Sequence, residues 1–174
     1  MKSLSEIETV SKRASRAAGY SWGVAEEVAK NIRLLEIFNL PGIKNLNSFF
    51  KKKKELRLEN ISLINKDNEA NKNGYCPIIA GLNCLDQIRT LEDLNEITFK
   101  KIAYPLLFLP FISRASEVIG KRIFLKMDDR EFLLNFNNNI YSNHTKNEII
   151  ESAENIYLKV LENQDSFEEK EWNE

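Results

Sequence analysis

The stretch that decides the fold is IFLKMDDREFLLNF, residues 123–136. Large apolar residues alternate with other residues in both of its halves, as they do in a strand with one buried face. Asp128 and Asp129 separate the two halves and are typical residues of a tight turn. A two-residue turn pairs Leu125 with Phe132, which places the large apolar side chains on one face. The stretch therefore predicts an antiparallel hairpin.

Helical spacing of apolar residues dominates the start of the chain. Ser3 opens a capping box for a first helix over about residues 4–18, and Ser21 can cap a second helix. A short third helix runs into the four lysines at 51–54. We expect residues 1–54 to fold as a compact three-helix unit.

The middle of the chain is less regular. Residues 56–64 and 97–104 have the composition of strands, and the polar stretch 65–74 predicts an exposed loop. Pro110 fits the first turn of a helix that ends at Gly120, because an N–H group at that position would have no helical partner.

The chain after the hairpin favours a helix. Thr145 with Glu148 forms a second capping box, and apolar residues follow at helical spacing up to Val160. We expect this helix to close the fold.

These patterns predict one α+β domain, which is also what a length of 174 residues favours. It would comprise an N-terminal helical unit, a small antiparallel sheet with a hairpin near residues 121–136, and a C-terminal helix. We expect the domain to span residues 1–163 and the acidic residues 164–174 to form a frayed tail.

Composition excludes several classes of function. The chain is 43% hydrophobic and 29% charged, as in globular proteins, and its 25 basic and 26 acidic residues give a net charge of -1. We therefore expect no nucleic-acid partner. Two cysteines and one histidine are too few for a typical structural zinc site, and the six glycines form no nucleotide-binding motif. The sequence predicts no metal and no cofactor.

The start of the chain lacks the apolar core of a signal peptide. The longest apolar run, residues 102–112, is about half the length needed to cross a bilayer, and Pro105 and Pro110 interrupt it. We expect a cytoplasmic protein without membrane association.

Three blocks of the sequence resemble a bacterial protein family of unknown function. RAAGYSWGVAEE at residues 16–27 is similar to the family's Arg-x-Ala-Gly and Trp-Gly-x-Ala-Glu-Glu block. Residues 77–81 and 105–111 are similar to its Pro-Ile-x-x-Gly and Pro-Leu-Leu-x-Leu-Pro-Phe blocks. The likeness extends over about residues 3–160. It implies an intracellular bacterial protein and brings no activity, substrate or catalytic residue with it.

The junction of the first two helices holds the candidate ligand-binding residues Arg16, Trp22, Glu26 and Glu27. Arg16 and the N–H groups at the start of the second helix can bind a carboxylate or a phosphate. Glu26 or Glu27 can act as a general base if burial raises its pKa. A structural role is the favoured interpretation, with an Arg–Glu surface pair, Trp22 as a packing anchor, and glutamates that complement the helix dipole.

Other chemically distinctive residues have ordinary explanations. Cys76 and Cys84 match neither a redox motif nor a zinc spacing, and the sequence offers only His144 as a histidine base. We expect both thiols to be inert. The lysines at 51–54 complement the dipole of the helix that they end, and we expect them to be solvated.

Two functions remain open at this point. The absence of a catalytic constellation favours a non-catalytic accessory subunit or small-molecule-binding module. A protein partner or a second copy would then bind through the apolar segment 104–112. The alternative is an enzyme that acts on a carboxylate- or phosphate-bearing metabolite, with Arg16 as the anion binder and Glu26 or Glu27 as the base.

Overall fold

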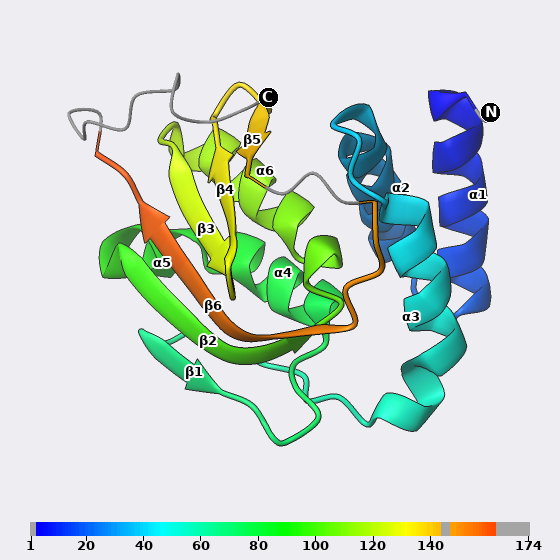
Figure 1. Ribbon diagram of the computed structural model, residues 1–174, viewed down its shortest axis with the longest axis horizontal. Coiled ribbons are helices and arrows are strands. Elements are labelled where there is room, and N and C mark those ends of the chain that lie inside the picture. Colours follow the sequence, from blue (N-terminus) through cyan, green and yellow to red (C-terminus); the bar gives the residue numbers. More distant parts are fainter. Residues whose placement is uncertain (1–2, 144–146, 163–174) are drawn as a thin grey trace.

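The computed structural model describes residues 3–143 and 147–162. The fold is α+β, with three N-terminal helices standing to the side of a six-stranded sheet (Figure 1). Its elements, in chain order, are α1 (Leu4–Ala17), α2 (Trp22–Ile37), α3 (Gly42–Leu56), β1 (Asp67–Glu69), α4 (Pro77–Asp86), α5 (Ile88–Leu94), β2 (Glu96–Ala103), the 3-10 helix η1 (Pro105–Leu107), α6 (Leu109–Ile119), β3 (Ile123–Met127), β4 (Arg130–Leu134), β5 (Ile140–Ser142) and β6 (Ser152–Val160).

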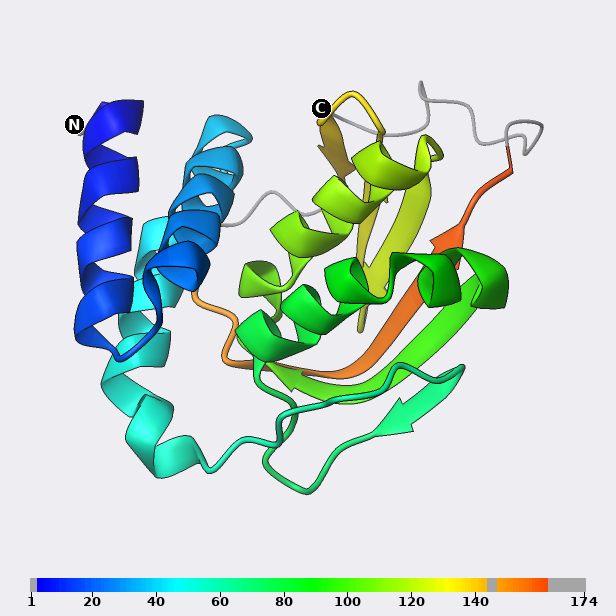
Figure 2. The ribbon, with the colours of Figure 1, turned by 180° about the vertical axis from the view of Figure 1, so that it is seen from behind.

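The sheet has the strand order β1-β2-β6-β3-β4-β5. β1 runs parallel to β2, and the other neighbouring strands pair in antiparallel fashion. Helices α4, α5 and α6 cover one face of the sheet, as Figure 2 shows from behind. The other face is turned toward the viewer in Figure 1.

The three-helix unit is confirmed, with α3 ending at Leu56 rather than at residue 54. The Ser3 hydroxyl accepts a hydrogen bond from the Glu6 N–H at 3.2 Å, and the Ser21 hydroxyl accepts one from the Val24 N–H at 3.3 Å. Both serines therefore cap their helices by satisfying N–H groups that lack a helical partner.

The hairpin is confirmed in its predicted register. Leu125 pairs with Phe132 and Ile123 with Leu134 in the β3–β4 ladder. All four of these side chains are fully buried, on a hairpin whose two strands both contact α6. The alternation of large apolar residues and the short turn were sufficient to fix this register.

The expected C-terminal helix is wrong, because its residues form the strand β6 between β2 and β3. Thr145, the expected helix cap, lies outside the described residues. Ile156, Leu158 and Val160 are buried and alternate with more exposed residues. Their spacing fits a strand, and the pairing of β6 with two neighbouring strands overrides the local helical pattern.

The middle of the chain also differs from expectation in part. The predicted loop at residues 65–74 contains the short strand β1, and residues 56–64 form only an isolated bridge, at Glu59 with Tyr75. The strand expected at residues 97–104 is β2. The helix expected to end at Gly120 is α6, and Gly120 adopts a φ of +77° at its end.

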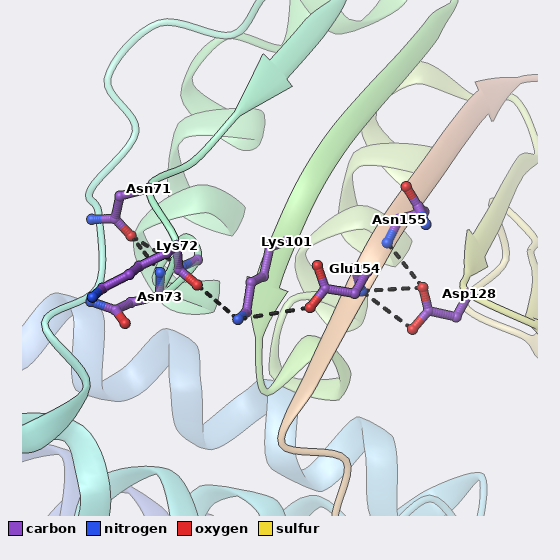
Figure 3. Close-up of polar contacts among 8 residues, drawn as sticks. Asn71, Lys72, Asn73, Lys101, Asp128, Glu154 and Asn155 are labelled. Carbon is purple, nitrogen blue, oxygen red and sulfur yellow. Dashed lines mark hydrogen bonds and ion pairs between the residues drawn. The ribbon is translucent and has the colours of Figure 1, made fainter.

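A polar network holds β6 between its two neighbours (Figure 3). The Asp128 carboxylate accepts hydrogen bonds from the N–H groups of Glu154 at 3.1 Å and Asn155 at 2.9 Å. On the other side, Lys101 donates to the Lys72 carbonyl at 2.8 Å and lies 3.7 Å from the Glu154 carboxylate. Asp128 is therefore more than a turn residue, because it also fixes a strand that lies 26 residues further along the chain.

Every residue of the apolar segment 104–112 is buried within the chain. Phe111 of this segment packs against α4 at Gly81, where a methyl group would overlap the Phe111 ring. The segment is therefore core, and the expectation that it forms an interface with a partner is wrong, because no part of it remains at the surface.

Candidate functional site

The corner between α1 and α2 is shaped by a short turn. Gly19 has a φ of +100°, a conformation that glycine adopts without steric cost, and its N–H donates to the Arg16 carbonyl at 3.0 Å. The Tyr20 N–H donates to the Ser15 carbonyl at 3.1 Å, after which Ser21 caps α2. The turn brings the last turn of α1 beside Trp22, the first residue of α2.

Trp22 is exposed and two cations lie against it. Its exposed fraction is 61%, which is high for a large apolar side chain. The guanidinium carbon of Arg16 lies 4.7 Å from the centre of the Trp22 ring, and the Lys12 ammonium lies 5.1 Å from it. Each such cation–π contact is worth about 0.5–1 kcal/mol at an exposed site. Arg16 also donates to the Tyr20 carbonyl at 2.8 Å, which orients its side chain.

An open pocket of about 390 Å³ lies between Trp22 and one face of α1. We call it the Trp22 pocket. It is lined by Thr9, Lys12, Arg13, Arg16 and Trp22. Three of these five residues are cationic and none is acidic, so the pocket has the charge and the apolar wall suited to an anionic ligand with an apolar part.

Glu26 and Glu27 contact different neighbours. Glu26 is 53% exposed and forms an ion pair with Lys12 at 3.3 Å, which places it at the margin of the Trp22 pocket. Glu27 is directed to the other side, where it pairs with Arg114 of α6. The structure thus brings Arg16 and Trp22 together and separates Glu27 from them. Neither glutamate forms an ion pair with Arg16 in the part of the chain that the structure describes.

Lys12 and Arg13 were not among the residues singled out from the sequence. They precede Arg16 by four and three residues, and side chains at those spacings lie on the same face of a helix. That spacing was the available signal. What the sequence did not reveal was the position of Trp22, which makes this face of α1 one wall of a pocket.

The two cysteines are buried and free. Burial raises the pKa of both the Cys76 and the Cys84 thiols, so little of either is in the reactive thiolate form. His144 lies outside the described residues. Within residues 3–143 and 147–162, no group of three or more His, Cys, Asp or Glu residues could hold a metal ion.

Two of the four lysines at the end of α3 have contacts within the chain. Lys52 pairs with Glu151, and the Lys53 ammonium lies 4.0 Å from the centre of the Tyr20 ring. The carbonyl of Tyr20 accepts the hydrogen bond from Arg16, so Lys53 adds a further positive charge near the corner of α1 and α2.

Comparison with known proteins assigns a family match to the first part of the chain. Residues 2–76 match the family described as "Protein of unknown function (DUF3726)". The match includes α1, α2 and the whole Trp22 pocket, together with the block at residues 16–27, and it stops before α4. The searches of curated proteins and of solved structures found no match. In the described part of the chain, no helix has the length and apolarity required to cross a membrane.

Proposed function

We propose that the protein is a non-catalytic binding module of the bacterial cytoplasm that recognises anionic groups in the Trp22 pocket. The observation that carries this proposal is an exposed indole ring with the Arg16 and Lys12 cations against it, in a pocket that has no acidic lining residue. The ligand class is a molecule with a carboxylate or phosphate group and an apolar part that covers Trp22. The two free cysteines support a reducing compartment.

The positions of Glu26 and Glu27 favour binding over catalysis. Each of these carboxylates is already engaged in an ion pair, Glu26 with Lys12 and Glu27 with Arg114, so neither side chain is free to turn toward a group bound at Arg16. Glu27 also lies away from the pocket. Arg16 therefore has no general base beside it for the alternative enzymatic mechanism.

Fluorescence of Trp22 provides a direct test. The chain has two tryptophans, so a Trp172→Phe variant leaves Trp22 as its single indole. We expect inorganic phosphate, citrate or adenosine monophosphate to change the Trp22 emission in a saturable manner. Arg16→Ala should weaken the binding of the responding probe by about tenfold, as expected for loss of one charge-assisted hydrogen bond.

Arg33→Ala is the matched control for that test. Arg33 is a surface arginine on α2 that pairs with Glu8 at 3.2 Å and does not line the Trp22 pocket. Its removal should leave the affinity for the same probe unchanged. The proposal fails if none of the three anions gives a saturable response, or if Arg16→Ala and Arg33→Ala bind the probe equally well.

A further inference from the structure

The Trp22 pocket continues into a longer groove along the outer side of α1 and α2. A second hollow, of about 310 Å³, shares Thr9 and Lys12 with the Trp22 pocket and is also lined by Ser5, Glu8, Glu26, Ala29 and Lys30. Between Ser5 and Arg16, helix α1 rises by roughly 16 Å at 1.5 Å per residue. We call the two hollows together the outer groove. It is longer than the site that a single small anion needs.

The floor and the rims of the outer groove differ in character. The second hollow has the small side chains of Ser5, Thr9 and Ala29, and its charged residues are Lys12, Lys30, Glu8 and Glu26. Small side chains between two helices let the backbone of a third helix approach closely. A groove that binds a helix contacts side chains spaced three or four residues apart on one face of that helix.

The charges of the outer groove are unbalanced. Its two carboxylates already have partners, because Glu8 pairs with Arg33 and Glu26 pairs with Lys12. Arg13 at one end and Lys30 at the other have no ion pair or hydrogen bond within residues 3–143 and 147–162. Both ends of the groove therefore offer a positive charge to an occupant.

We infer that the outer groove binds an acidic helix of a partner protein. This inference rests on the proposed function and names the kind of ligand that carries the anionic groups. Carboxylates on one face of the partner helix meet Arg13 and Arg16 at one end and Lys30 at the other, and an apolar residue of the same face covers Trp22. A helix of about three turns spans the distance. In this arrangement the chain is an accessory subunit.

A pair of labelled model peptides tests this inference. Both are alanine-based helices of about fifteen residues, one with glutamate and the other with glutamine at every fourth position. Fluorescence anisotropy on the full chain should show binding of the glutamate peptide that weakens as salt is added. The glutamine peptide should bind at least about tenfold more weakly, because it lacks the charges that match the groove.

Three variants locate the binding. Lys30→Glu reverses the charge at the far end of the groove, and Ser5→Trp fills its floor, and neither residue lines the Trp22 pocket. Each should weaken the binding of the glutamate peptide by roughly fivefold or more. The response of Trp22 to inorganic phosphate should stay unchanged. Lys54→Glu, at an exposed lysine of α3, is the control for the change in net charge and should bind the peptide less than about twofold differently from the wild type.

The outcomes separate this inference from the proposed function. Equal binding of the glutamate and glutamine peptides, or wild-type affinity of Lys30→Glu and Ser5→Trp for the glutamate peptide, overturns the acidic helix as the ligand. The proposed function still stands in that case if phosphate or another small anion titrates Trp22 and the titration depends on Arg16. Absence of any response, to peptides and to small anions alike, overturns both.

Discussion

The outer helix α1 and the layer of α4 to α6 on the sheet differ in how many large apolar side chains they bury. Helix α1 buries one apolar side chain, Ile7, together with Ser11 and Ser15, and its Leu4 and Val10 are more than a third exposed. The sheet and the helices on it hold most of the largest fully buried side chains, which are Phe99, Phe108, Phe111, Phe132, Tyr104, Ile78, Leu91 and Ile97. Stability is therefore concentrated in the sheet half, and the face of α1 in the outer groove is free for recognition.

This difference predicts how substitutions in the two regions behave. Changes in the sheet half should lower the free energy of unfolding, because close packing there leaves little room for adjustment. Changes to the exposed groove residues of α1 and α2 should alter binding and leave folding almost untouched. The following variants test that contrast, from the largest expected effect to the smallest.

Gly81→Ala should have the largest effect. A methyl group at Gly81 would overlap the Phe111 ring, so α4 and α6 would have to move apart. We expect the free energy of unfolding to fall by about 3 kcal/mol, at the upper end of the cost of overpacking a core. Chemical denaturation monitored by circular dichroism measures this change.

Gly23→Ala is the matched control in the helical unit. Gly23 also lies within a helix, but a methyl group there has no neighbour within 4 Å. Its effect should stay within about 0.5 kcal/mol. Combining Gly81→Ala with Phe111→Leu should cost less than the sum of the two single changes, because the smaller side chain makes room. Strict additivity would contradict the proposed overlap.

Asp128→Ala should lower the free energy of unfolding by about 2 kcal/mol. It removes the acceptor of two backbone N–H groups in β6 and leaves an alanine at a φ of +56°, where aspartate is better tolerated. Asp129→Ala, at the exposed neighbouring residue of the same turn, should cost less than about 0.5 kcal/mol. Equal losses of stability for the two variants would show that Asp128 contributes only as a turn residue, and not through its hydrogen bonds to β6.

Asp128 also illustrates what the sequence could predict. Its place in the turn follows from local information, namely a short polar pair between two alternating stretches. Its bonds to Glu154 and Asn155 depend on β6 lying beside β3, and local pattern assigned those residues to a helix. Ile156 and Val160 are spaced by four, which suits both a helix face and alternate positions of a strand. The choice between them is made by pairing with distant strands.

The candidate site was predictable to a similar extent. Arg16 and Trp22 flank one turn, so their proximity followed from the short sequence distance between them. The partner of Glu27 could not be predicted from sequence distance, because Arg114 is 87 residues away and reaches α2 only through the packing of α6. Sequence spacing alone treats Glu26 and Glu27 as equivalent. The structure distinguishes them by the helix that each one faces.

Replacing Tyr157, on the less covered face of the sheet, should have a smaller effect on the free energy of unfolding. This effect depends on pH. Burial raises the pKa of Tyr157 from 10.0 to about 12, and its hydrogen bond to the Glu96 carboxylate adds to the rise. The unfolded chain therefore loses this proton at lower pH than the folded chain, so stability falls as pH rises from about 10 to about 12. In urea denaturation, Tyr157→Phe should lose less stability than the wild type over this interval, and an identical loss in both proteins would contradict the assignment.

Replacing Arg16 and replacing Arg114 test most directly whether recognition and stability lie in separate parts of the molecule. Arg16→Ala has the smallest expected effect on stability. Arg16 is exposed and its contacts are confined to the corner of α1 and α2, so Arg16→Ala should change the free energy of unfolding by less than about 0.5 kcal/mol. Arg114 pairs with Glu27 across the joint of α2 and α6, with both side chains about 30% exposed. Arg114→Ala should therefore cost about 1 kcal/mol, because it leaves Glu27 without its partner.

Anion binding should show the reverse order for the same two variants. Arg16→Ala should bind the responding anion about tenfold more weakly while keeping the wild-type midpoint of denaturation. Arg114→Ala should keep the response and denature earlier, because Arg114 does not line the Trp22 pocket. If Arg114→Ala weakened the binding as well, the pocket would depend on how α2 is held against α6. Recognition and stability would then be coupled through Glu27, instead of residing in separate parts of the molecule.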